Sequence, residues 1–94
     1  MTEKRNINPG DVVAHFKRET LSEAEKSTNR YLYKIIGVAQ HSETKEDMMI
    51  YMALYDDFGL YARPLEMFLS EVDKEKYPHI RQAYRFEKFE INEK

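Results

Sequence analysis

The chain contains no cysteine, no tryptophan, and only three glycines and three prolines among its 94 residues. The lack of cysteine excludes disulfides, thiol nucleophiles and cysteine-ligated zinc sites. Because small secreted domains usually depend on disulfides, we expect a cytoplasmic location. Three widely spaced glycines do not form a glycine-rich phosphate loop, which excludes nucleotide hydrolysis of the P-loop type.

Long apolar runs and an excess of basic charge are also missing. No apolar segment approaches the roughly 18 residues of a membrane span, and the first ten residues lack the apolar core of a signal peptide. We therefore expect no contact with a membrane. Fifteen Lys and Arg against seventeen Asp and Glu give a net charge of −2. This balance excludes a domain held on nucleic acid by bulk positive charge, although a local basic patch stays open.

Aromatic residues are abundant, with seven Tyr and five Phe. Such a composition is typical of a folded chain, and the length suits a single small core. We expect a flexible tail over residues 1–9 and one domain over residues 10–91. The dipeptide Pro9-Gly10 marks the turn at which the domain begins.

Five segments rich in β-branched and aromatic residues are bounded by turn residues, which predicts five short strands. They cover residues 12–16, 31–40, 48–55, 60–63 and 84–87. Gly37 lies inside the second segment and predicts a bulge or a sharp bend. The third segment is apolar at every position, which indicates a strand buried on both faces. Pro64 ends the fourth strand and favours a short helix from Leu65 to about Ser70.

Residues 17–30 are rich in charge and lack an apolar stripe. Ser22 and Glu25 match a capping box, so a short helix or a loop outside the core is expected here. The whole pattern predicts a mostly β fold: a small, SH3-like, partly open barrel of about five strands with one short helix. Its unpaired edges are compatible with a monomer or a weak homodimer.

Several short motifs follow one another in a defined order along the chain. They are His15-Phe16-Lys17, a Tyr-rich strand, HSET at 41–44, RPLEMF at 63–68 and Arg85-Phe86. In this order, over residues 10–86, the sequence resembles DUF1653, a family of domains of unknown function. The resemblance implies a small bacterial β-barrel domain and supplies no activity. It also implies that residues 18–30 are a surface insertion relative to the family pattern.

Two arrangements of residues could suggest catalysis. His41, Ser42 and Glu43 contain the residue types of a catalytic triad, but neighbours on an extended chain point to opposite faces, and no nucleophile elbow is present. We interpret this segment as a turn stabilised by hydroxyl groups. Asp56 and Asp57 form a second pair, which we assign to a solvated hairpin turn. The sequence therefore predicts no catalytic residues.

The chain has three histidines, and none shows the spacing of a known metal motif. His15 and His41 lie at strand ends that could be neighbours in a barrel, and Glu43 could complete a two-His-one-carboxylate site. We favour the simpler interpretation, in which both histidines form hydrogen bonds to local backbone. No metal and no cofactor are predicted.

Arg63 is the most informative charged residue. On strand parity it shares a face with Tyr61, and a guanidinium beside aromatic rings suits an anion, a carboxylate or a stacked base. The structural alternative is a bidentate pair with Glu43, Glu46 or Glu66.

Four aromatic residues of the middle segments divide into two groups. Tyr51 and Phe68 are expected in the core, whereas Tyr55 and Tyr61 belong either to the core or to an exposed rim. From strand-end position and chemistry we predict a ligand-binding site formed by His15, His41, Glu43, Tyr55, Tyr61 and Arg63.

Three functions remain compatible with this site. We favour a non-enzymatic module that binds a peptide or protein partner. The alternative is binding of single-stranded nucleic acid or a nucleotide through the same surface. A small-molecule enzyme that uses His41 with Glu43 is the third hypothesis.

Overall fold

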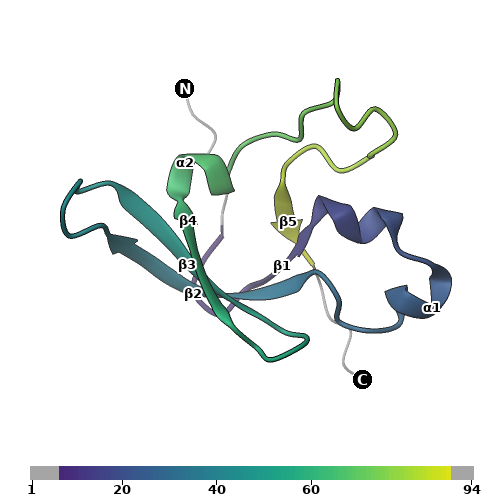
Figure 1. Cartoon of the computed structure of the whole chain (residues 1–94), viewed down its shortest axis with the longest axis horizontal. Helices are drawn as coiled ribbons and strands as arrows, with labels where there is room; N and C mark the ends of the chain where they lie inside the picture. The colour runs from purple at the N-terminus through teal and green to yellow at the C-terminus, as the bar shows by residue number, and fades with distance from the viewer. Residues whose placement is uncertain (1–6, 90–94) are drawn as a thin grey trace.

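The structure, a computed structural model, describes residues 7–89. Five antiparallel strands form one sheet in the order β4-β3-β2-β1-β5 (Figure 1). Their bounds are Val12–His15 for β1, Leu32–Gln40 for β2, Asp47–Ala53 for β3, Leu60–Pro64 for β4 and Phe86–Lys88 for β5. The edge strands β4 and β5 are not paired with each other, so the sheet is not closed. The predicted mostly β fold with five strands is confirmed.

Two short α-helices accompany the sheet: α1 over Glu23–Lys26 and α2 over Leu65–Phe68. The capping box predicted at the start of α1 is confirmed, because the Glu25 N–H donates to Ser22 Oγ at 3.2 Å and the Ser22 N–H donates to Glu25 Oε1 at 3.4 Å. Helix α2 is shorter than predicted. Pro64 is both the last residue of β4 and the N-cap of α2.

The first strand ends one residue earlier than predicted. Phe16 begins a short 3-10 helix, η1 (Phe16–Thr20), and turns away from the sheet. Its ring is buried in a second, smaller cluster with Val72 and Ile80, and Tyr77 packs against that cluster. Packing of Phe16 against Val72 and Ile80, which follow α2 in the chain, accounts for the end of β1 at His15.

Arg18 organises the segment between η1 and β2. Its guanidinium donates to the carbonyl oxygens of Lys26, Thr28 and Arg30 at 2.7, 3.1 and 2.7 Å. The guanidinium carbon also lies 5.2 Å from the centroid of the Phe89 ring. One side chain therefore holds most of the segment that was predicted to lie outside the core.

The predicted irregularity in β2 is confirmed. The register with β3 shifts between Ile35 and Gly37, and Gly37 has a φ of +156°, a region that favours glycine. Before the bulge, Tyr33 and Ile35 face the core, whereas Ile36 is 46% exposed.

The prediction that β3 is buried on both faces is wrong. Only Met49, Tyr51 and Ala53 are buried, and the alternate residues are partly exposed. The strand also ends before Tyr55, because the chain turns at Asp56 with a φ of +55°. The apolar run Met48–Ala53 of β3 therefore covers one core face and leaves a half-exposed outer face.

The main core lies on one face of the sheet and is dominated by aromatic rings. Phe68 of α2 stacks on Phe86 of β5 with ring centroids 4.1 Å apart and an interplanar angle of 7°. Both are fully buried, and the remaining members are Val13, Tyr33, Ile35, Met49, Tyr51 and Ala53. Because Phe68 of α2 belongs to this core, the chain turns toward the core directly after β4.

The ends of the chain extend only partly into the described range. Ile7, inside the predicted tail, packs against the main core, and the Asp11 N–H donates to the Asn8 carbonyl at 3.0 Å to close the predicted turn. The predictions for residues 1–6 and for the domain end at residue 91 lie outside the described residues. Between residues 7 and 89, no helix combines the length and the apolar character of a membrane span.

Candidate functional site

His15, the last residue of β1, lies between the core and the surface. Its Nδ1 accepts the Lys17 N–H at 3.1 Å, so the imidazole caps η1. Its ring stacks on Phe16 at 4.4 Å and meets the edge of Phe86 at 4.9 Å. Burial, and then the positive charges of Arg63, Lys17 and Arg85, lower the pKa of His15 from 6.5 to about 4. His15 is therefore neutral at pH 7, and Nε2 carries its proton.

Arg63, in β4, reaches the same phenylalanine from the opposite edge of the sheet. Its Nε donates to Tyr51 Oη at 3.2 Å, and its guanidinium carbon lies 5.5 Å from the Phe86 ring centroid. The predicted structural alternative, a pair with Glu43, Glu46 or Glu66, is not present. Across residues 7–89 the only ion pair joins Lys88 and Asp11, at 3.6 Å.

Tyrosine rings extend from the core beside Arg63 to the solvent-exposed surface. Tyr51 and Phe68 are buried, as predicted. The Tyr33 and Tyr55 hydroxyls share a hydrogen bond of 2.6 Å, and burial together with this bond raises the pKa of Tyr33 above its usual range. Tyr61 packs against Tyr51 with ring centroids 5.8 Å apart and is 48% exposed.

These contacts define one surface, which we call the aromatic rim: His15, Tyr31, Tyr55, Tyr61 and Arg63. Tyr31 belongs to it because its ring lies 6.0 Å from both His15 and Tyr55. Four of the six residues predicted from the sequence thus come together around Tyr33 and Phe86. The rim combines aromatic rings with a guanidinium that forms no ion pair with any carboxylate of residues 7–89, which suits contact with an anionic or aromatic group.

The other two predicted residues, His41 and Glu43, lie in the loop between β2 and β3. His41 Nδ1 accepts the N–H groups of Glu43 and Thr44 at 3.1 and 3.2 Å, which is the local backbone bonding we favoured over a metal site. The side chains of His41 and Glu43 are exposed. This loop is far from the rim: β2 separates His41 from Tyr31 by ten residues, or roughly 30 Å of strand.

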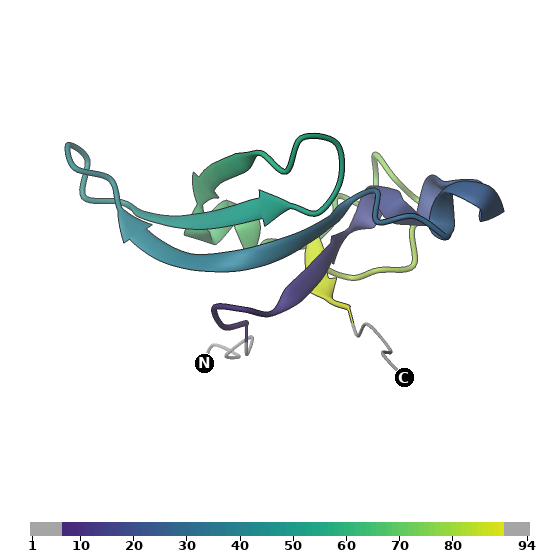
Figure 2. The ribbon, with the colours of Figure 1, turned by 90° about the horizontal axis from the view of Figure 1, so that it is seen from below.

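Figure 2 shows this separation directly. The β2–β3 hairpin projects to the left, and the region of η1 and α1 lies at the right. His15 and His41 are therefore not neighbours, because the two histidines lie at opposite ends of the long strand β2. No group of three His, Asp or Glu residues within 7–89 is arranged to hold a metal ion.

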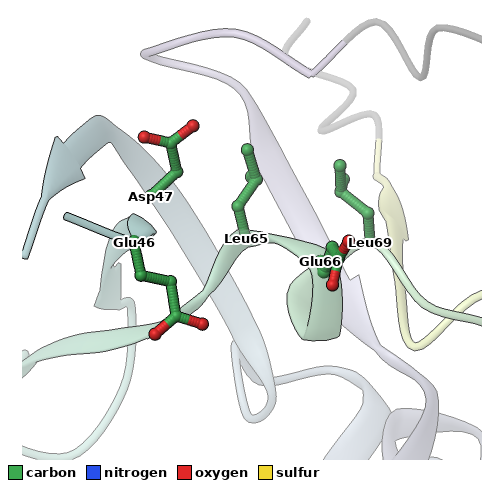
Figure 3. A pocket seen from close by; sticks show the side chains of 5 residues that line it. All are labelled: Glu46, Asp47, Leu65, Glu66 and Leu69. Carbon is green, nitrogen blue, oxygen red and sulfur yellow. The ribbon is translucent and has the colours of Figure 1, made fainter. Parts of the chain in front are cut away.

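A hollow of about 360 Å³ lies elsewhere, between the start of β3 and α2. It is lined by Glu46, Asp47, Leu65, Glu66 and Leu69 (Figure 3). The two leucines point the same way, whereas the three carboxylates point in different directions. The carboxylates do not converge on one point, and the hollow does not include any residue of the rim.

Sequence reasoning missed Tyr31 as part of the rim and Phe86 as its support. Phe86 contacts both His15 and Arg63, although 71 and 23 positions along the chain separate it from them. Alternation in the last predicted strand would have placed Phe86 inside. The tight turn before β2, where Tyr31 has a φ of +68°, carries no comparable signal in the sequence.

Comparison with known proteins adds one finding. No curated protein and no solved structure matches this chain. One family model, described as "Protein of unknown function (DUF1653)", matches residues 11–88, a span that contains all five strands and every residue of the rim. The chain therefore belongs to the DUF1653 family, as its ordered motifs indicated.

Proposed function

We propose that this domain is a non-enzymatic binding module that holds a peptide segment of a partner protein at the aromatic rim. One observation carries the proposal: the Arg63 guanidinium rests over Phe86 with no carboxylate beside it in the described part of the chain. Such a group is suited to a carboxylate of a partner. The cysteine-free composition supports a cytoplasmic setting.

The chemistry of Arg63 explains how it would serve a ligand. A guanidinium has five N–H donors, and the contact to Tyr51 uses only Nε–H. Tyr51 and Phe86 hold the plane of the guanidinium, so little side-chain entropy remains to be lost on binding. Tyr61 adds an exposed ring next to this donor.

His15 would contribute a neutral side chain to the rim. Because its pKa is lowered to about 4, it adds no charge at pH 7. Its Nε2–H remains suited to donate to a ligand oxygen, while Nδ1 is occupied by the Lys17 N–H. The rim would thus offer one fixed cation, one neutral donor and aromatic rings.

The proposal is tested by an amide-resonance titration of the labelled protein. The probes are an equimolar pool of acetylated octapeptides rich in Glu and aliphatic residues, and the same pool with Gln in place of Glu. We expect the acidic pool to shift resonances of Tyr55, Tyr61 and Arg63, and the Gln pool to bind more weakly. Loss of a charge-assisted hydrogen bond is worth about 1.5–3 kcal/mol, or roughly tenfold to a hundredfold in affinity.

Two variants with the same change in charge sharpen the test. Arg63→Gln should abolish the response, whereas Arg81→Gln, on an exposed side chain that is not part of the rim, should keep it. No shift in the rim with either pool, or equal effects of both variants, would refute the proposal.

Single-stranded nucleic acid is the second candidate, and the positive charge of Arg63, Lys17 and Arg85 around His15 favours it. An oligothymidine or oligouridine would then shift the same rim resonances, with an affinity that falls steeply as salt is added. Binding of the oligonucleotide without binding of the acidic pool would replace the peptide proposal by this one.

A further inference from the structure

Among residues 7–89, strand β4 forms a free edge of the sheet. In the order β4-β3-β2-β1-β5 it pairs only with β3, and Figure 1 shows it running directly into α2. The opposite edge, β5, has three residues, whereas β4 has five. The rim residues Tyr61 and Arg63 therefore lie on β4, the longer of the two edge strands.

The register identifies which backbone groups of β4 face outward. The Ala53 N–H donates to the Gly59 carbonyl at 2.9 Å, and Tyr51 lies opposite Tyr61 in the same register. In an antiparallel ladder, alternate residues direct their N–H and C=O toward the partner strand. Leu60 and Ala62 therefore direct both groups away from β3, and Pro64, the next such position, has no N–H.

The side chains along this edge are as exposed as its backbone. Leu60 is 64% exposed and Tyr61 is 48% exposed. Proteins commonly protect an edge strand with lysines, prolines or a bulge, and here only Pro64 at the end of the strand does so. Leu60 and Ala62 lie on the outer face, while Tyr61 and Arg63 lie on the face that carries the rim.

We propose that the partner segment binds as an added strand along β4, pairing with the backbone of Leu60 and Ala62 and setting a carboxylate beside Arg63. This inference rests on the function proposed above and specifies its geometry. Main-chain hydrogen bonds would provide affinity, and the alternating side chains would meet the rim on one face and Leu60 on the other.

Charge complementarity selects an acidic peptide rather than a second copy of this chain. Pairing of β4 with its own copy about Tyr61 would set Leu60 opposite Ala62 and Arg63 opposite Gly59. That arrangement places no carboxylate opposite Arg63. Asp57 does not extend the strand, because Asp56 and Phe58 on either side have φ values of +55° and +57°.

The experiment uses an acetylated and amidated pentapeptide, TVEVT, whose length matches the five residues of β4. Its glutamate faces the rim when its valines face Leu60 and Ala62. We expect the peptide to shift the amide resonances of Leu60 and Ala62 and to slow their hydrogen exchange.

A pair of variants tests the backbone contact itself. Ala62→Pro removes one outward N–H and should reduce affinity by about tenfold, whereas Ala62→Ser keeps the N–H and should stay within about twofold of the wild type. Proline is tolerated at an edge position whose N–H faces solvent, and the dispersion of the amide spectrum verifies the fold.

A second measurement needs no protein variant. Two forms of the pentapeptide carry N-methyl groups on alternate amides, one set for each edge of the added strand. Only one of the two forms should lose binding, because only one edge of the peptide faces β4. Equal binding of both forms would overturn strand addition.

The outcomes separate this inference from the function on which it rests. If Arg63→Gln loses the acidic octapeptides and Ala62→Pro keeps them, strand addition is wrong and the rim proposal stands. If the octapeptides bind and TVEVT leaves Leu60 and Ala62 unchanged, strand addition is wrong as well. A concentration-dependent dimer in sedimentation that Ala62→Pro abolishes would assign the edge to a second copy and overturn the inference.

Discussion

The environment of His15 makes the stability of this domain depend on pH in a way that one substitution can isolate. In the folded state its pKa is lowered from 6.5 to about 4, first by burial and then by Arg63, Lys17 and Arg85. Between these two values the unfolded chain binds a proton on His15 that the folded chain does not. The contribution of His15 to the free energy of unfolding is therefore fully present above about pH 6.5 and is lost as the pH falls toward 4.

The size of the effect follows from the two pKa values. Between about pH 7 and pH 4.5 the linkage amounts to roughly 2.5 kcal/mol. His15 is partly exposed, so its interactions with the three cations are screened by solvent. We therefore expect His15 to account for about 1–2 kcal/mol of the stability lost over this range.

His15→Asn is the variant that tests this reasoning. The Asn side-chain oxygen can still accept the Lys17 N–H, so the cap of η1 is kept while the titrating group is removed. Urea unfolding of both proteins at the two pH values gives four free energies. The wild type should lose about 1–2 kcal/mol more than the variant.

His41→Asn is the matched control. His41 caps its own loop through Nδ1, as His15 does, but its side chain is exposed at the far end of β2. This variant should follow the pH dependence of the wild type. An equal loss of stability in the wild type and in His15→Asn would refute the account, because carboxylates elsewhere would then explain the whole dependence.

Two further substitutions test the core and the segment that Arg18 holds. Phe86→Ala removes the ring that stacks on Phe68, so the free energy of unfolding in urea should fall by about 3–5 kcal/mol. Val38→Ala, at a 55% exposed position, should change it by less than about 0.5 kcal/mol, and comparable losses would contradict the assigned core. Arg18→Gln removes three bonds to backbone carbonyls, so amides of residues 18–30 should exchange faster while β3 amides keep their rates. Unchanged exchange in that segment would show that Arg18 does not hold it.

The elements of this fold were predictable because each depends on neighbouring residues. The bulge at Gly37 required a residue that accepts positive φ, and the cap of α1 required Ser22 and Glu25 at a fixed spacing. The extent of burial was less predictable. The uninterrupted apolar run Met48–Ala53 in β3 is compatible with either one buried face or two, and only the placement of the other elements decides between them.

The site was predictable only in part, since strand parity assigns a residue to a face and not to a place in the sheet. Parity joined Arg63 with Tyr61 correctly. It did not show that β2 is long enough to carry His41 away from His15. Nor did it show that Arg63 and His15, from different parts of the sheet, would meet over Phe86. That meeting depends on the strand order and on the curl of the whole sheet.

Net charge was a poor guide to the rim for a related reason. Two acidic residues bind backbone N–H groups of the loop after α2: Glu19 of η1 accepts those of Arg81 and Gln82, and Glu87 accepts those of Ala83 and Tyr84. These carboxylates fix the loop after α2 and do not neutralise Arg63. A chain with a net charge of −2 can therefore present a positive, aromatic surface. The choice between an acidic peptide and a nucleic acid consequently depends on the local charge at the rim. For that reason a salt titration of each probe discriminates between them, and the overall composition does not.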